Sequence, residues 1–348
     1  MRNLFIVLIT VSNLVACGGG GEQDGFSTSL SVSGANAIAQ VTNDVVERQN
    51  LTQGSETVNS STDSITLSSI ENSSIDVSLA KFVDVSQKSG IQFGVGFMEP
   101  MSNAEIPDIL PSGVASGDFD LDGDIDLMIV RGDIGPNLFY RNLGSLIFEE
   151  IATEMGIAYT KSETENWRHS SPALVDLDGD RFPDLVLPGL DGDPTKIFKN
   201  INGERFLDVT EASGLSQMKA RNTMSPAFAD VDLDGDLDMA FGHWGTPRSP
   251  SQPSSETEHL WRNDTDSEGI KFSAMTFSAN ISPGILLIDN PKITQTALDY
   301  TFTPTFADIN NDHYPDLLMV ADFYYSQIFI NNRDGTFLNV TDLGVIKD

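Results

Sequence analysis

Short apolar runs separated by polar turns recur from about residue 80 to the end of the chain. Two examples are Leu127–Val130 and Leu185–Leu187, and neither continues into the 3.6-residue period of an amphipathic helix. Runs of this length, bounded by Pro, Gly, Asn and Asp, are typical of short buried β-strands. The pattern therefore predicts an all-β domain over residues 80–348.

Each unit of an internal repeat contains four of these predicted strands. An acidic segment joins the first two strands of a unit, and its four copies are 118–126, 176–184, 230–238 and 308–316. The first strand begins at Pro in the last three units (171–175, 225–229 and 303–307). The third ends in Asn (138–142, 197–200, 260–263 and 328–331), and the fourth is represented by 206–210 and 337–341. Units of four strands without helical periodicity predict the blades of a β-propeller. A Pro/Ser-rich insertion at about 246–257 lengthens the third unit.

The predicted propeller is incomplete. Lys81–Ser86 has the pattern of a blade's last strand, yet no first three strands precede it. The fourth unit already has its own last strand, so we expect about four blades plus one orphan N-terminal strand, with about three further blades missing at the C-terminal end. A closed ring of four blades is the alternative, and it would leave the orphan strand without a partner.

The acidic segments have the spacing of a cation-binding loop. Positions 1, 3, 5 and 9 are Asp or Asn in all four copies, and carboxylate oxygens are the ligands that Ca²⁺ prefers. Position 7 varies in side chain, as expected of a residue that binds through its backbone carbonyl. An EF-hand is excluded, because its loop needs Glu at position 12, where this chain has Ile129, Leu187, Phe241 and Met319. A solvated turn remains the alternative for any single copy.

Together these motifs resemble FG-GAP/VCBS repeats, the blades of integrin-α-like propellers. The resemblance rests on the Asp-rich segments, the strands ending in Phe-x-Asn and the Phe-x-x-Val-Thr strands, and it covers about residues 80–348. The segment Phe206–Leu215 is also similar to bacterial proteins that carry an ASPIC/UnbV domain. The resemblance implies Ca²⁺ bound by Asp118, Asp120, Asp122, Asp124 and Asp126; by Asp176, Asp178, Asp180, Phe182 and Asp184; by Asp230, Asp232, Asp234, Asp236 and Asp238; and by Asp308, Asn310, Asp312, Tyr314 and Asp316.

The second and fourth loops depart from the family pattern. Glycine is usual at position 6, where these loops have Arg181 and His313. Gly179 and Asn311 stand two residues earlier and tolerate a left-handed turn there. We expect the fourth loop to bind most weakly, because it has no glycine and Asn310 replaces a charged ligand.

The N-terminus has the pattern of an exported lipoprotein. A basic start and an apolar run to Ala16 predict a signal peptide over residues 1–16, and Leu14–Gly18 resembles a lipobox with Cys17 as the lipidated residue. An ordinary signal peptide is the alternative. Four glycines and a polar, aromatic-poor continuation predict a flexible tether over residues 17–79. The predicted location is the bacterial outer membrane or cell surface, attached to the membrane by the lipid.

Charge and motif content narrow the function. A net charge of −31 argues against nucleic acid as a partner, and Cys17, the single cysteine, leaves Ca²⁺ to hold the loops in place of disulfides. No catalytic motif is found, so we expect a surface-anchored recognition or adhesion module that binds a protein or glycan through loops at one face. The alternatives are a polysaccharide-active enzyme, with a site near Trp167, His169, His243 and Trp244, and a structural envelope component.

Overall fold

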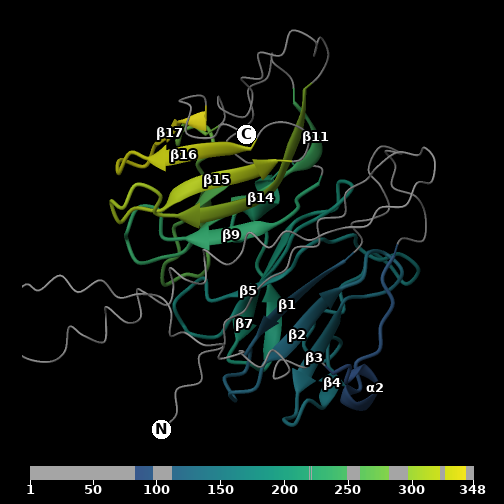
Figure 1. Cartoon of the computed structure of the whole chain (residues 1–348). Coiled ribbons are helices and arrows are strands. Elements are labelled where there is room, and N and C mark those ends of the chain that lie inside the picture. The colour runs from purple at the N-terminus through teal and green to yellow at the C-terminus, as the bar shows by residue number, and fades with distance from the viewer. Residues whose placement is uncertain are drawn as a thin grey trace, which may run out of the picture. The chain divides into compact units, whose positions relative to one another are not determined.

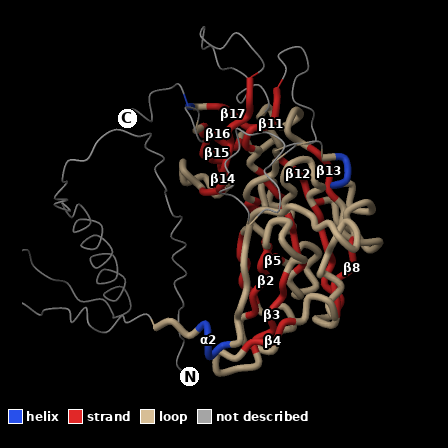
Figure 2. The backbone as a smooth tube through the Cα atoms, turned by 90° about the vertical axis from the view of Figure 1, so that its right-hand side faces the viewer, coloured by secondary structure: helices blue, strands red, loops and turns tan. Residues whose placement is uncertain are grey.

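The computed structural model describes residues 83–96, 112–218, 220, 222–248, 259–281, 297–321 and 326–341. These residues belong to one compact unit, residues 80–348. Strands and loops make up nearly all of it, and the helices are single short turns such as α2 (Ser86–Ser89) and η2 (Leu215–Gln217) (Figure 2). No helix among the described residues has the length and apolar character needed to cross a membrane.

The strands form four antiparallel sheets, which we call blades 1 to 4 (Figure 1). Blade 1 contains β1 (Gly113–Gly117), β2 (Asp126–Val130), β3 (Leu138–Asn142) and β4 (Phe148–Glu150). Blade 2 contains β5 (Ala173–Val175), β6 (Asp184–Leu187), β7 (Lys196–Ile201) and β8 (Arg205–Asp208). Blade 3 contains β9 (Pro226–Ala229), β10 (Asp238–Phe241), β12 (Leu260–Asn263) and β13 (Phe272–Ala274). In each of these blades the strands neighbour one another in chain order, as the sequence predicted.

Blade 4 has one strand more than predicted. It contains β14 (Ala297–Ala307), β15 (Asp316–Ala321), β16 (Gln327–Asn331) and β17 (Phe337–Asn339), and β11 (Trp244–Arg248) pairs with β14 at its edge. The start of the insertion in the third unit therefore forms a strand of the next blade, where only a loop was expected. The ladder breaks between Trp244 and Thr246, and such an irregularity bends the edge strand.

Three apolar cores join neighbouring blades. The first lies between blades 1 and 2, where the rings of Phe119 and Phe139 meet edge to face at 4.8 Å and Phe139 meets Phe206 at 5.6 Å. The second joins blades 2 and 3 around Trp261, and the third joins blades 3 and 4 around Phe329. Each buried Phe contributes roughly 1.5–3 kcal/mol through the area it removes from water. Among the described residues no core cluster joins blade 4 to blade 1, so the closed four-blade ring finds no support there.

Hydrogen bonds repeat at each junction between blades. The turn after the fourth strand of one blade accepts the backbone N–H of the Phe near the start of the next blade's fourth strand. These bonds join Phe206 N to Met155 O at 2.9 Å, Phe272 N to Ser213 O at 2.8 Å and Phe337 N to Ala279 O at 2.9 Å. The blades are thus joined by directional bonds as well as by their cores.

The orphan strand predicted over Lys81–Ser86 is wrong in its described part. Val83–Val85 are not in a strand, and α2 begins at Ser86. The Asp84 carboxylate accepts the Ser86 N–H at 2.9 Å and the Val85 carbonyl accepts the Ser89 N–H at 2.8 Å. A helical turn satisfies these groups locally, and none of the described strands pairs with Val83–Val85.

Candidate metal-binding loops

The four acidic segments lie where the sequence predicted, as hairpin loops between the first two strands of each blade. We call them loops 1 to 4 and number their nine positions from the first Asp. The carboxylate at position 1 holds each loop closed. In loop 1, Asp118 accepts the N–H groups of Asp122 at 3.0 Å and Gly123 at 2.9 Å. Loops 3 and 4 repeat both bonds at Asp230 and Asp308.

Two left-handed positions shape every loop. Position 4 has φ of 61° at Leu121, 74° at Gly179, 60° at Leu233 and 60° at Asn311. Position 6 is also left-handed, including Arg181 at 78° and His313 at 74°. The turn-easing roles predicted for Gly179 and Asn311 are therefore confirmed. An ordinary residue pays about 1–2 kcal/mol for this conformation, so every loop carries strain at one position at least.

Position 9 has a structural role that its motif alone did not reveal. The side chains of Asp126, Asp184, Asp238 and Asp316 are buried. In Asp184, one oxygen accepts the Leu177 N–H at 3.0 Å and the other accepts the Asn200 N–H at 2.8 Å. Burial raises the pKa of Asp184 to about 7, because the anion loses its hydration. This residue ties the loop to the third strand, whether or not it also contacts a metal.

Burial raises the corresponding pKa values of Asp126 to about 6 and of Asp238 to about 7.

At position 7 the side chains point to no common partner. Their backbone N–H groups instead donate to the position 5 carboxylate at 2.8 to 3.0 Å, and these residues are Asp124, Phe182, Asp236 and Tyr314.

Three loops gather carboxylate oxygens within 4.8 Å of one another. The clusters are Asp118, Asp120 and Asp122 in loop 1; Asp176, Asp178 and Asp184 in loop 2; and Asp230, Asp232 and Asp234 in loop 3. In loop 4, Asn310 takes the place of one carboxylate, and its amide bonds to Asp312 at 3.0 Å. The clusters thus contain positions 1, 3 and 5 in loops 1 and 3 and positions 1, 3 and 9 in loop 2, and metal binding at the predicted residues stays a prediction.

An unsatisfied oxygen in loop 1 fits a bound cation. Asp120 Oδ1 is buried and has no hydrogen-bond partner. Desolvation and the neighbouring Asp122 carboxylate raise the pKa of Asp120, so the anion is poorly compensated by the protein alone. Hard oxygen donors that lack a proton donor are the chemistry of a Ca²⁺ site. The residues present therefore fit the ion that the repeat implies.

Basic side chains from the third strands approach the loops differently. Arg141 Nε lies 3.2 Å from Asp120 Oδ2. Lys199 Nζ contacts Asp178 and lies 3.0 Å from Asp180 in loop 2. Arg262 instead bonds Asp264 at 2.8 Å, outside the nine positions of loop 3. The loops are therefore not equivalent in their surrounding charge.

The Asn near the end of the third strand in blades 2 to 4 has a recurring role that only the structure reveals, because its side chain links one blade to the preceding one. Asn200 Nδ2 donates to Phe119 O at 2.8 Å, and Phe119 is position 2 of loop 1. Asn263 makes the same bond to Leu177 O at 2.8 Å, and Asn331 makes it to Val231 O at 2.8 Å. The recurrence of Asn was visible in the sequence, but its partner lies 81 to 100 residues away.

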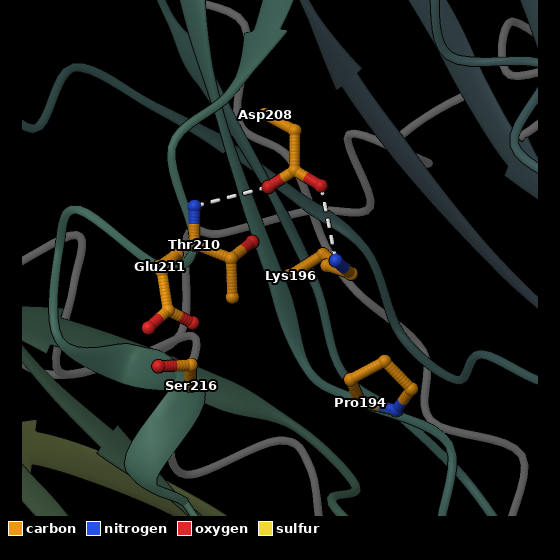
Figure 3. A pocket seen from close by; sticks show the side chains of 6 residues that line it. All are labelled: Pro194, Lys196, Asp208, Thr210, Glu211 and Ser216. Atoms are coloured by element: carbon orange, nitrogen blue, oxygen red, sulfur yellow. Dashed lines mark hydrogen bonds and ion pairs between the residues drawn. The ribbon is translucent and has the colours of Figure 1, made fainter.

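The opposite ends of the strands hold Trp167, one of the residues expected near a ligand site, together with Tyr159, which the sequence did not indicate. Tyr159 and Trp167 stack at 5.3 Å, with Lys196 over Tyr159 at 5.2 Å and Lys161 over Trp167 at 5.0 Å. Beside this column lies a groove of about 360 Å³ (Figure 3), whose lining residues are Pro194, Lys196, Asp208, Thr210, Glu211 and Ser216. Lys196 pairs with Asp208 at 3.0 Å.

The histidines expected on this face are buried instead. His169 and His243 are 0% exposed, and Trp244 is also buried. Burial lowers the pKa of His169 to about 3, because a charged imidazole cannot be hydrated there. The ring of His243 lies 4.7 Å from that of His259, a pairing that sequence separation hid. These histidines fill the interior and do not form an accessible rim.

Comparison with known proteins agrees with the repeat. The family model for the FG-GAP-like repeat matches residues 118–187 and 176–241, which include loops 1, 2 and 3. No curated protein matches the chain. The predicted lipidation site Cys17 and the tether over residues 17–79 lie outside the described residues.

Proposed function

We propose, for this FG-GAP repeat protein, a role as a calcium-stabilised recognition or adhesion module that binds a protein or glycan. Proteins of this repeat are typically non-enzymatic. The observation that carries the calcium part is Asp120, whose buried Oδ1 lacks any partner within a cluster of three carboxylates. In a chain with net charge −31, a bound divalent cation also offsets repulsion among the loops.

The residues that would hold Ca²⁺ are the carboxylates at positions 1, 3 and 5 of loops 1 and 3. When bound, the ion supplies positive charge that replaces the hydration lost by these oxygens. The chain's own part is to fix the loop. Asp118 closes it through two N–H groups, and Asn200 then holds the Phe119 carbonyl against blade 2. A loop 1 held in one conformation thereby also restrains blade 2, through the bond from Asn200 to Phe119 O.

The ligand surface is proposed at the strand ends opposite the loops. In an antiparallel blade the first hairpin and the second hairpin lie at opposite ends of the second strand. The groove beside Lys196 and Asp208 lies at the second hairpin's end of blade 2 and offers charges, hydroxyls and a neighbouring aromatic column. Polar grooves of this composition suit a hydroxyl-rich or charged ligand such as a glycan or a polar peptide segment.

A catalytic role for His169 and His243 loses its structural basis, because neither imidazole can reach a polymeric substrate from the interior.

Attachment to the outer membrane or cell surface through Cys17 is part of the proposal and rests on the N-terminal pattern. Membrane fractionation of a Cys17→Ser variant tests it, and an unchanged membrane fraction would refute the anchor.

The deciding experiment is thermal unfolding of the chain in Ca²⁺, in Mg²⁺ at equal ionic strength, and in excess EDTA. Ligand at 100 times its Kd stabilises by about 2.7 kcal/mol, so Ca²⁺ should raise Tm well above the value in Mg²⁺. Asp120→Asn removes the charge at the unsatisfied oxygen and should abolish most of that rise, while the exposed Glu154→Gln should keep it. Equal Tm in Ca²⁺, Mg²⁺ and EDTA would overturn the calcium proposal.

A further inference from the structure

Loop 2 differs from the other loops because a side-chain ammonium lies among its carboxylates. Lys199 is on β7, immediately before Asn200. Its Nζ contacts Asp178 at position 3 and lies 3.0 Å from Asp180 at position 5. These two carboxylates belong to the positions that would otherwise face a metal ion.

The same strand position in the other blades does not place a cation in this way. Arg141 reaches Asp120 Oδ2 through Nε, while its guanidinium carbon lies 5.3 Å from the ring centroid of Phe119. Asp120 Oδ1 remains without a partner. Arg262 turns to Asp264. Among the described residues, only Lys199 bridges positions 3 and 5 of its loop.

The chemistry of lysine explains why it can occupy such a place. An ammonium is a compact point charge with three donors on a flexible stem, whereas guanidinium is a wide planar fork. The side chains of Lys199 and Asp178 are 24% and 10% exposed. Their attraction is therefore less screened by salt than that of a fully exposed pair.

We propose that Lys199 acts as a built-in cation of loop 2, so that this loop keeps its conformation without metal and binds Ca²⁺ more weakly than loops 1 and 3. The inference rests on the proposed binding of Ca²⁺ to the loops. Loop 2 also carries the Leu177 carbonyl that accepts the Asn263 amide of blade 3. The junction between blades 2 and 3 is accordingly independent of metal, whereas the junction between blades 1 and 2 depends on loop 1.

Calcium titration of the full chain by calorimetry tests the inference with two methionine variants. Lys199→Met removes the built-in cation. Lys271→Met is the matched control, because its ammonium pairs with Asp266 and Glu268 outside the four loops and the substitution removes the same net charge. The Lys199 variant should gain one Ca²⁺ equivalent or bind at one site at least about tenfold more tightly, while the control should match wild type.

Identical stoichiometry and affinity in both variants would overturn the role of Lys199, and so would loss of a site in the Lys199 variant. Absence of Ca²⁺ binding by wild type above that of Mg²⁺ would instead refute the calcium proposal itself. Lys199→Gln serves where the Met variant does not fold, as judged by circular dichroism.

Hydrogen exchange of wild type gives a second readout that needs no substitution. In EDTA the N–H groups of Gly179 and Arg181, which bond to Asp176, should remain protected. Those of Asp122 and Gly123 in loop 1 should become protected only when Ca²⁺ is added. Equal gains of protection in the two loops on adding Ca²⁺ would contradict the inference.

Discussion

Replacing Asn200 with Ala should separate blades 1 and 2 more than any other single truncation of a polar side chain near the loops. The Asn200 side chain is 0% exposed and makes three hydrogen bonds. Its Nδ2 donates to Phe119 O at 2.8 Å and to Pro183 O at 3.0 Å, and its Oδ1 accepts Gly203 N–H at 2.8 Å. Replacement by alanine removes the hydrogen bonds to Phe119 O, Pro183 O and Gly203 N.

The magnitude follows from the burial of those partners. Phe119 O and Gly203 N are buried, whereas Pro183 O is only partly buried. A buried polar group left without a partner costs roughly 1–3 kcal/mol, so the two buried groups predict a loss of about 2–6 kcal/mol. Asn142 is the matched control in blade 1. Its side chain bonds Ile125 O at 3.1 Å and Gly144 N at 3.0 Å. Among the described residues it makes no bond to another blade, and Ile125 is exposed to water. Asn142→Ala should cost about 1–2 kcal/mol.

Thermal unfolding followed by tryptophan fluorescence measures the difference, because Trp261 lies in the core between blades 2 and 3. A difference of about 2 kcal/mol corresponds to roughly 4–8 °C in Tm for a domain of this size. Asn200→Ala should therefore melt at least that far below Asn142→Ala in the same buffer. Equal Tm values for the two variants would refute the reasoning that the bond between blades carries stability beyond the bonds within a blade.

Two further predictions concern packing and protonation. Gly203→Ala should cost roughly 2–4 kcal/mol, because a Cβ would lie 2.7 Å from Asp120 Cα at φ +72°. Gly179→Ala, at φ +74° with open space, should cost only about 1–2 kcal/mol in urea unfolding. Equal costs would contradict the contact between the blades. His169 is neutral when folded but takes up a proton below its ordinary pKa of 6.5 when unfolded, so stability falls as pH drops from 6.5 toward 3. The loss should reach about 2 kcal/mol by pH 5, and His169→Gln should remove that part of the pH dependence; parallel pH profiles would show the prediction to be wrong.

The strand order and the loops could be predicted because they are encoded within one repeat. Each strand pair and each Asp loop depends on residues that are close together in the sequence. The apolar runs before and after an Asp segment fix the register, as in Leu174 opposite Leu185 in β5 and β6. A shift by one residue would turn these side chains to the other face. Alignment of four copies then separates the pattern from chance.

What the sequence did not reveal depends on contacts between repeats. The Asn200 amide and the Phe119 carbonyl are 81 residues apart, and a carbonyl has no sequence signature. Burial of His169 likewise depends on how connections from two blades pack, since a histidine between Arg168 and Ser170 is equally compatible with a surface loop. The pairing of β11 with β14 joins an insertion to the following blade, which no pattern within one repeat could indicate.

These contacts between repeats change what a cation in one loop can do. If each loop were joined only to its own strands, binding would stabilise one hairpin, and the effects of the loops would add independently. Instead, position 9 anchors the Asn backbone within a blade, while the Asn amide holds position 2 of the preceding loop, as Asp184, Asn200 and Phe119 show. Ordering loop 1 therefore also orders the attachment point of blade 2. Because each such bond runs from one blade to its predecessor, stabilisation spreads between nearest neighbours, as in a linear array of coupled units. A loop held by its own lysine would keep the same conformation whether or not its neighbours bind metal. Coupling between the metal loops on either side of it should therefore be weak.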